Sequence, residues 1–160
     1  MSFPPVYDSR CTVLILGTYP SPKSREVNFY YGHPQNRFWP LLAKLCHADL
    51  PQTVDEKRAL LLDHRIALWD VCESCEIKGA DDSTIKKERM TPNDIAPLFK
   101  ESRIEAIYCN GSKAYALFQH FFKGAAALPV FLLPSTSPAN AAYSIDRLAV
   151  SWKIIFRKPQ

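Results

Sequence analysis

CTVLILG, residues 11–17, is a short run of apolar and β-branched residues closed by a glycine. A run of this length and composition is typical of a buried β-strand. Three further runs have the same character, and they are IALWDV (66–71), IEAIYCNG (104–111) and PVFLLP (129–134). We therefore expect four strands spread along the whole chain.

The segments between these runs carry helical patterns. Helices are expected over residues 37–46, 55–64, 93–102, 112–122 and 141–158. Thr91-Pro92 ahead of the third helix and Ser112 at the start of the fourth are the expected caps. Because strands that alternate with helices need crossover connections, we expect an α/β protein: a three-layer α/β/α sandwich with a four-stranded, mainly parallel sheet.

The 160 residues fit one domain with a single core, preceded by a loose arm over residues 1–10. We find no basic-then-apolar leader and no apolar run long enough to span a membrane, so a cytoplasmic location is expected. We also expect a monomer. The five cysteines do not indicate a disulfide framework, and only Cys72 and Cys75 form a C-x-x-C pair. We expect small, buried or half-buried thiols rather than a metal or redox centre.

The ends of the predicted strands are the expected place for ligands, because open parallel sheets bind them outside the carboxyl ends of their strands. These ends are GTYPS (17–21), WDVCESC (69–75), NGS (110–112) and PSTSPAN (134–140). The residues between Gly17 and Trp39 match neither strand nor helix, and a loop of that length in a compact domain usually carries function.

Several common chemistries lack their motifs in these loops. There is no G-x-S-x-G turn for a nucleophilic hydrolase, no G-x-G-x-x-G fingerprint and no G-K-[ST] phosphate loop. The loops offer aromatic faces, amides and hydroxyls instead. These groups are Tyr19, Tyr30, Tyr31, Asn36, Asn110, Ser135, Thr136, Ser137 and Asn140. Aromatic faces with amide edges can hold a single nucleobase, although each residue taken alone can equally serve packing or a turn.

Acidic residues are scarce around the same loops, while the net charge of +4 is mild. None lies between Glu105 and Asp146, and Glu26 is the only one between Asp8 and Asp49. Loops without carboxylates suit a polyanionic partner, because nearby negative charge weakens each phosphate contact.

Four segments together resemble the uracil-DNA glycosylase superfamily, and within it the hypoxanthine (deoxyinosine) DNA glycosylases. The segments are GTYPSPKSREVNFYYGHPQNRFW (17–39), LWDV (68–71), CNGSKAY (109–115) and PSTSPAN (134–140). The resemblance implies a four-stranded parallel sheet between helices. It also implies hydrolysis of the N-glycosidic bond of a damaged base flipped out of double-stranded DNA, without a metal or organic cofactor. The four-cysteine iron-sulfur pattern of some relatives is not matched here.

One position departs from the pattern of most superfamily members. Tyr19 stands where they place Asp or Asn after the first strand, and it cannot position water with an amide or carboxylate. The resemblance implies that this catalytic role passes to Asn36 of HP-x-N, as in the hypoxanthine branch. The expected base-binding residues are Gly17, Tyr19, Tyr31 and Asn110. The expected DNA-binding residues are Ser21, Lys23, Ser24, Lys113, Ser135, Ser137, Pro138 and Asn140.

Two other functions stay open. HP-x-N-RFW also occurs in mismatch-specific uracil/thymine DNA glycosylases, and hypoxanthine and uracil share a carbonyl beside a ring N–H. The residue types therefore do not separate these substrates. Tyr19 at the usual Asp/Asn position also allows a non-catalytic, lesion-binding module.

Overall fold

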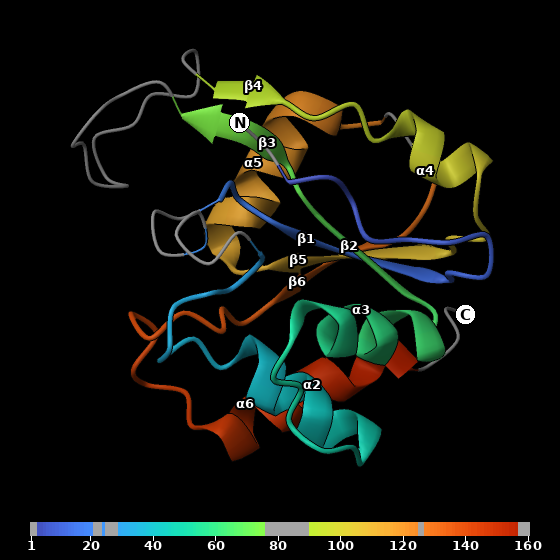
Figure 1. The fold of residues 1–160 in the computed structure, drawn as a ribbon. Helices are drawn as coiled ribbons and strands as arrows, with labels where there is room; N and C mark the ends of the chain where they lie inside the picture. Colours follow the sequence, from blue (N-terminus) through green and yellow to red (C-terminus); the bar gives the residue numbers. More distant parts are fainter. Residues whose placement is uncertain (1–2, 21–23, 25–28, 76–89, 125–126, 157–160) are drawn as a thin grey trace.

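A four-stranded parallel sheet forms the centre of the computed structural model, which describes residues 3–20, 24, 29–75, 90–124 and 127–156. The strands are β1 (Val13–Gly17), β2 (Ile66–Asp70), β5 (Ala106–Asn110) and β6 (Val130–Leu133). They pair in the order β2-β1-β5-β6, all in parallel (Figure 1). The expected four strands and the α/β class are confirmed.

Helices cover both faces of the sheet, as Figure 1 shows. One face carries α2 (Phe38–Cys46), α3 (Val54–Asp63), α6 (Ile145–Trp152) and the short 3-10 helix η3 (Lys153–Phe156). The other carries α5 (Ser112–Phe122), the short α4 (Ala96–Lys100) and an antiparallel ribbon of β3 (Cys72–Cys75) and β4 (Met90–Pro92). The three-layer arrangement follows the predicted alternation of strands and helices.

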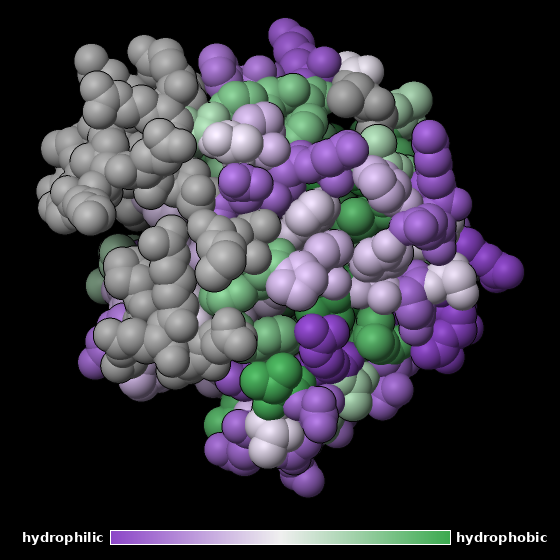
Figure 2. All heavy atoms as spheres, turned by 45° about the horizontal axis from the view of Figure 1, so that its top comes forward, coloured by the Kyte–Doolittle hydropathy of each residue, from purple (hydrophilic) through white to green (hydrophobic). Residues whose placement is uncertain are grey.

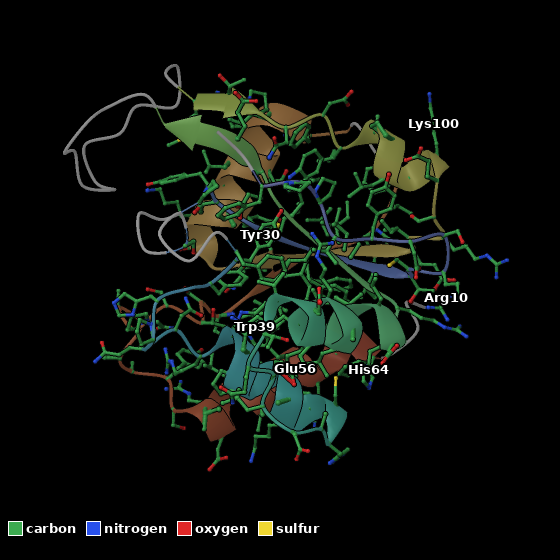
Figure 3. The ribbon with its side chains drawn as sticks, in the orientation of Figure 1. Arg10, Tyr30, Trp39, Glu56, His64 and Lys100 are labelled. Atoms are coloured by element: carbon green, nitrogen blue, oxygen red, sulfur yellow. The ribbon has the colours of Figure 1, made fainter. Side chains whose placement is uncertain are left out.

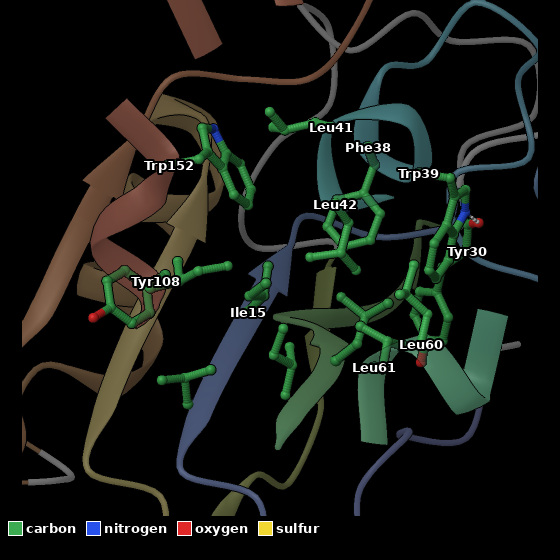
Figure 4. Packing of buried hydrophobic residues seen from close by; sticks show 14 of the residues in the cluster. Ile15, Tyr30, Phe38, Trp39, Leu41, Leu42, Leu60, Leu61, Tyr108 and Trp152 are labelled. Atoms are coloured by element: carbon green, nitrogen blue, oxygen red, sulfur yellow. Dashed lines mark hydrogen bonds between the residues drawn. The ribbon is translucent and has the colours of Figure 1, made fainter. Parts of the chain in front are cut away.

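Successive side chains of β1 pack into two separate hydrophobic cores. Ile15 packs with Phe38 and Trp152 on the α2/α6 side, where Figure 4 shows the cluster from close by. Leu14 and Leu16 pack on the opposite side, against residues of α4 and α5. Because neighbouring side chains of a strand point to opposite faces, a strand covered on both sides is apolar throughout. This is why CTVLILG lacks the polar alternation of a half-exposed strand.

Three predicted helix boundaries are wrong. Thr91-Pro92 belongs to β4 and does not start a helix, because it pairs with β3, and α4 begins only at Ala96. The cap of α5 is Gly111 at φ 98°, a backbone conformation that favours glycine, and Ser112 is already the first helical residue. The last helix begins at Ile145, where Ser144 accepts a hydrogen bond from the N–H of Arg147.

The expected loose N-terminal arm is also wrong for residues 3–10. Phe3 and Val6 are buried, and Val6 exchanges two backbone hydrogen bonds of 2.9 Å with Leu68. Burial of Phe3 and Val6, together with the backbone hydrogen bonds to Leu68, offsets part of the chain entropy that this segment loses when it is ordered. The segment covers the outer edge of β2, which would otherwise present unpaired backbone groups.

Neither a membrane-spanning helix nor a cluster of metal ligands is found among the described residues. No helix there is both long and apolar enough to cross a bilayer. Among the same residues, no three His, Cys, Asp or Glu side chains gather in a way that could hold a metal ion. On the face shown in Figure 2, hydrophobic residues form separate spots between hydrophilic ones.

Candidate active site

A cleft of about 780 Å³ opens over the carboxyl ends of the sheet strands. Gly17 of β1, Asp70 of β2, Asn110 of β5 and Leu133 of β6 all line it. Its volume lies in the range of small-molecule sites, on the order of 300–1,000 Å³. Arg10, before β1, lies at the opposite end of the sheet (Figure 3). The cleft is therefore where parallel α/β sheets generally place their ligands.

Most residues proposed from the sequence line this one cleft. They are Gly17, Tyr19, Ser24, Tyr31, Asn36, Asn110, Lys113, Ser135, Ser137 and Asn140. Pro138 is not among the lining residues, and Ser21 and Lys23 lie outside the described residues. The two irregular loops, after β1 and after β6, thus meet above the same sheet edge.

Asn36 is fixed at the start of α2 by its carbonyl oxygen. The Oδ1 atom accepts one hydrogen bond from the N–H of Phe38 and one from the hydroxyl of Thr136, both 2.9 Å long. Its backbone N–H donates to His33. Among the described residues, no hydrogen bond uses the Nδ2 amide group. The side chain therefore presents an oriented N–H donor to a ligand.

Thr136 links Asn36 to Asn110. The sequence analysis named it among the polar groups of the loops but gave it no role of its own. Its side chain is completely buried. Asn110 donates from Nδ2 to the Thr136 hydroxyl at 3.0 Å and accepts from the Thr136 N–H at 3.0 Å. The Thr136 hydroxyl then donates to Asn36. This chain fixes both amides and leaves Asn110 one amide hydrogen and one acceptor site.

Asp70 is a functional candidate that the sequence analysis did not name. It ends β2 and is only 5% exposed, yet no hydrogen bond from the described residues ends at its carboxyl group. Burial raises the pKa of this carboxyl to about 7. Buried carboxyl groups without a partner are rare in protein interiors and are common at functional sites. In the sequence, the position of Asp70 at the end of a predicted strand was the signal that could have identified it.

Gly17 makes room for Asp70 and for the Tyr31 hydroxyl. A Cβ atom on Gly17 would lie 2.5 Å from Asp70 Oδ1 and 2.9 Å from Tyr31 Oη. Both distances are far below van der Waals contact, so a side chain here would displace the two groups. Gly17 and Asp70 are direct partners in the β1/β2 register, which accounts for this close approach.

Tyr31 is held in an unusual conformation over Gly17. Its φ of 53° is left-handed, which costs a non-glycine residue on the order of 1 kcal/mol or more. One ring face stacks on Phe38 at a centroid distance of 4.3 Å. The hydroxyl is buried and makes no hydrogen bond of 3.5 Å or less. Burial and then the nearby Asp70 charge raise its pKa, and the nearby Asn110 side chain lowers it in part. Strain of this kind is typical of functional sites.

The neighbouring Tyr30 has a structural role. Its hydroxyl donates to the carbonyl of Pro4 at 2.9 Å, and its own carbonyl accepts from the indole of Trp39 at 3.0 Å (Figure 4). The sequence left open whether Tyr30 binds a ligand or packs in the core. These contacts favour packing.

Two of the expected DNA-binding residues, Ser24 and Lys113, make contacts within the protein. Ser24 is 4% exposed, and its hydroxyl accepts from the N–H of Gly32. The Lys113 ammonium group lies 5.2 Å from the centre of the Tyr19 ring and 3.4 Å from its hydroxyl. Ser24 is therefore poorly placed for the DNA backbone, whereas Lys113 brings positive charge to the wall of the cleft.

The loop after β6 is ordered by its own polar groups. The Ser135 hydroxyl accepts from the Ser137 N–H, and the Ser137 hydroxyl accepts from the Ala139 N–H, both at 3.1 Å. The Asn140 amide donates to the Ser135 carbonyl at 3.0 Å. Ser137 does not cap the last helix, whose N-cap is Ser144.

Arg37 fastens this loop to α2. Its guanidinium donates to the carbonyls of Ser137 at 2.8 Å and Asn140 at 3.0 Å, and also to those of Thr136 and Tyr143. One side chain thus holds the backbone of the second loop against the first.

Replacing Arg37 with methionine is expected to lower the free energy of unfolding by about 2–4 kcal/mol, because buried carbonyls lose charge-assisted donors. Arg37→Lys is the matched control. Its free energy of unfolding should fall less, because one ammonium group can still donate to some of these carbonyls. Urea unfolding of both variants measures the difference. If Arg37→Met lowers the free energy of unfolding by less than about 0.5 kcal/mol, the loop after β6 is stable without Arg37.

Replacing Asp70 with asparagine is expected to stabilise the protein in a pH-dependent way. The folded-state pKa of about 7 exceeds the ordinary value of 3.8, so the folded chain binds the extra proton between these values. Wild-type stability therefore falls as pH rises from about 4 to about 7. The gain from Asp70→Asn should approach roughly 4 kcal/mol at pH 8 and less than half of that at pH 5. Denaturant titration at both pH values tests this, and equal gains would contradict it.

Comparison with known proteins gives the family. An α/β/α sandwich with a polar and aromatic cleft at its strand ends defines a ligand-binding α/β protein, frequently an enzyme. The family model for the uracil DNA glycosylase superfamily matches residues 4–155. The chain belongs to the uracil DNA glycosylase superfamily.

Its relatives agree with this assignment. A curated protein of Methanosarcina acetivorans named hypoxanthine DNA glycosylase is 36% identical over 158 residues, which cover 97% of this chain and 96% of the relative. Another of that name, from Methanosarcina barkeri, is 36% identical over 118 residues, covering 70% and 71%. A solution NMR structure of a candidate uracil DNA glycosylase from M. acetivorans matches with a TM-score of 0.80 and 33% identity, over 97% of this chain and 94% of that one.

Proposed function

We propose that this chain is a monofunctional DNA glycosylase that removes a deaminated base, hypoxanthine first, from double-stranded DNA and leaves an abasic site. The observation that carries the proposal is the cleft, which is lined by the Asn36 amide and by the buried carboxyl of Asp70 and hydroxyl of Tyr31 beside Gly17. The relatives named hypoxanthine DNA glycosylase support the choice of base.

The proposed reaction needs water and no cofactor. The oxygen of water forms a bond to C1′ while the bond from C1′ to the base nitrogen breaks, and the electron pair leaves with the base. The displaced water proton passes to solvent or to the released base. Hypoxanthine and uracil leave readily because the carbonyl beside their ring N–H accepts the developing charge.

Asn36 is the proposed catalytic residue. Its Oδ1 is already engaged by Phe38 and Thr136, so its amide N–H is the group that can bind and orient the attacking water. Asn110 retains one amide hydrogen, which can donate to the departing base. Preorganised neutral donors of this kind are typically worth about 10²–10³ in rate.

Binding of DNA is proposed for the rim of the cleft. Lys113, Ser135, Ser137 and Asn140 line its walls, and both loops come from stretches poor in acidic residues. In this proposal Pro138 stiffens the loop after β6, and Tyr19 and Tyr31 contact the extruded base. We further propose a single-domain monomer acting in the cytoplasm.

Matched duplexes carrying inosine, uracil opposite guanine, or xanthine test the proposed substrate in parallel assays. We expect the fastest release of base from the inosine duplex. Faster release of uracil would assign the chain to the mismatch-specific uracil/thymine type. Tight, salt-dependent binding of the inosine duplex without an abasic product would show a non-catalytic, lesion-binding module, the alternative that Tyr19 at the usual Asp/Asn position allows.

A further inference from the structure

A tyrosine and an arginine lie side by side where the loop after β6 leads into α6. The guanidinium carbon of Arg147 is 4.1 Å from the centre of the Tyr143 ring, a close cation–π contact. Tyr143 lines the cleft, and Arg147 lies in the first turn of α6. In Figure 1, the start of α6 lies on the side of the molecule where the sheet strands end. The pair is therefore at the rim of the cleft.

Tyr143 is held in place through its backbone and through its ring. Its N–H donates to the Asn140 carbonyl at 3.2 Å, and its own carbonyl accepts from the Arg37 guanidinium. Its half-buried side chain packs against the hydrophobic core on the α2/α6 side. The ring is thus a fixed surface, and it orients the guanidinium of Arg147.

The positive charge of Arg147 is not neutralised by a carboxylate among the described residues. Its neighbour Asp146 pairs instead with Lys44 at 3.2 Å. Arg147 is exposed, and its Nη1 donates to the Ala142 carbonyl at 3.3 Å. Because a guanidinium carries five N–H donors, the side chain can still donate to a ligand.

A flat cation that is held on an aromatic ring suits a phosphate group. The guanidinium fork donates two parallel hydrogen bonds to phosphate oxygens. Stacking on a ring orients the fork beforehand, so less side-chain freedom is lost on binding. The sequence between Glu105 and Asp146 contains no acidic residue that would weaken such a contact.

We propose that the pair of Arg147 and Tyr143 binds a DNA phosphate beside the extruded nucleotide and so extends the DNA-binding surface from the cleft onto the first turn of α6. The inference rests on the proposed function. A phosphate contact positions the duplex and reads no sequence, so the pair determines how tightly DNA is held and not which base is removed.

Titration of a duplex that carries a tetrahydrofuran abasic analogue tests this contact, because the duplex resembles the product and has no base to release. We expect Arg147→Ala to bind it about 5–10-fold more weakly at about 0.1 M salt. The slope of log affinity against log salt concentration should become shallower by about 0.9, as expected for one lost phosphate contact. The loss should be equal for every base opposite the analogue.

Lys153→Ala is the matched control, since it removes one exposed positive charge from η3, beyond the other end of α6. It should bind within about twofold of the wild type, with an unchanged slope. The inference is overturned if Arg147→Ala keeps the wild-type affinity and slope, or if Lys153→Ala loses as much. A loss that varies with the opposing base would also overturn it, because it would indicate a contact to a base.

Two substitutions of Tyr143 test the role of the ring. Tyr143→Phe keeps the aromatic face and should bind within about twofold of the wild type, whereas Tyr143→Leu should lose about threefold. Combined with Arg147→Ala, Tyr143→Leu should cause no further loss, because the ring acts through the guanidinium. Fully additive losses would show that the two side chains do not act as one unit and would refute the pair.

Base release from an inosine duplex separates this inference from the proposed function. In the wild-type background, the loss in Arg147→Ala should appear in the enzyme concentration at half saturation rather than in the maximal single-turnover rate. If no variant releases base but the affinity and slope change as expected, the proposed glycosylase activity is wrong and the phosphate contact stands. If the wild type releases base and Arg147→Ala binds DNA normally, only the phosphate contact is wrong.

Discussion

Asn36→Ala is expected to excise base about 10²–10³-fold more slowly than the wild type, while its affinity for an inosine duplex changes by no more than about threefold. The loss follows from the amide N–H, which is the part of Asn36 free to orient water. Duplex affinity should persist because the rim residues are unchanged. Single-turnover excision and duplex titration of the same preparation measure the two effects.

Asn36→Asp separates the catalytic role of Asn36 from its structural one. A carboxylate can still accept from the Phe38 N–H and the Thr136 hydroxyl, so α2 and the loop after β6 keep their anchor. The N–H donor is lost, however, and excision should fall by at least about tenfold. Wild-type excision by Asn36→Ala would refute the assignment, and wild-type excision by Asn36→Asp would refute the role of the N–H group.

Thr136→Val is expected to slow excision by about 100-fold and to lower the free energy of unfolding by about 1–3 kcal/mol. Valine fills the same volume but removes the acceptor of the Asn110 amide group and one of the two donors to Asn36 Oδ1. Each amide would then be held by one hydrogen bond instead of two. The effect should appear in the maximal single-turnover rate and not in the duplex concentration at half saturation.

Thr136→Ser keeps the hydroxyl and is the matched control. It should restore excision to within about fivefold of the wild type, although the missing methyl group costs some stability. Equal rates for the valine and serine variants would show that the hydroxyl link between the two amides has no role in the reaction.

The sheet could be predicted from the sequence because its strands are covered on both faces. Continuous apolar runs such as CTVLILG leave few alternatives once helical patterns separate them. The β3/β4 ribbon was missed, because its strands are four and three residues long and the segment between them is polar. Short strands are specified by their partners more than by their own composition.

The candidate site could be predicted only in part. Residue types and resemblance led to Asn36, Tyr31 and Asn110, which do line the cleft. Asp70 and the linking role of Thr136 were missed, since their importance depends on burial and on which hydrogen bonds are satisfied, and both arise from tertiary structure. The same reason explains Ser24, whose hydroxyl is used inside the protein.

Release of free hypoxanthine from a duplex with a single inosine is the most direct test of the central claim that this cleft hydrolyses the bond to an extruded deaminated base. With the full chain in excess, we predict one free hypoxanthine and one abasic site per duplex by mass spectrometry, and no deoxyinosine nucleoside. An intact duplex after hours, or release of the nucleoside by strand cleavage, would contradict the account.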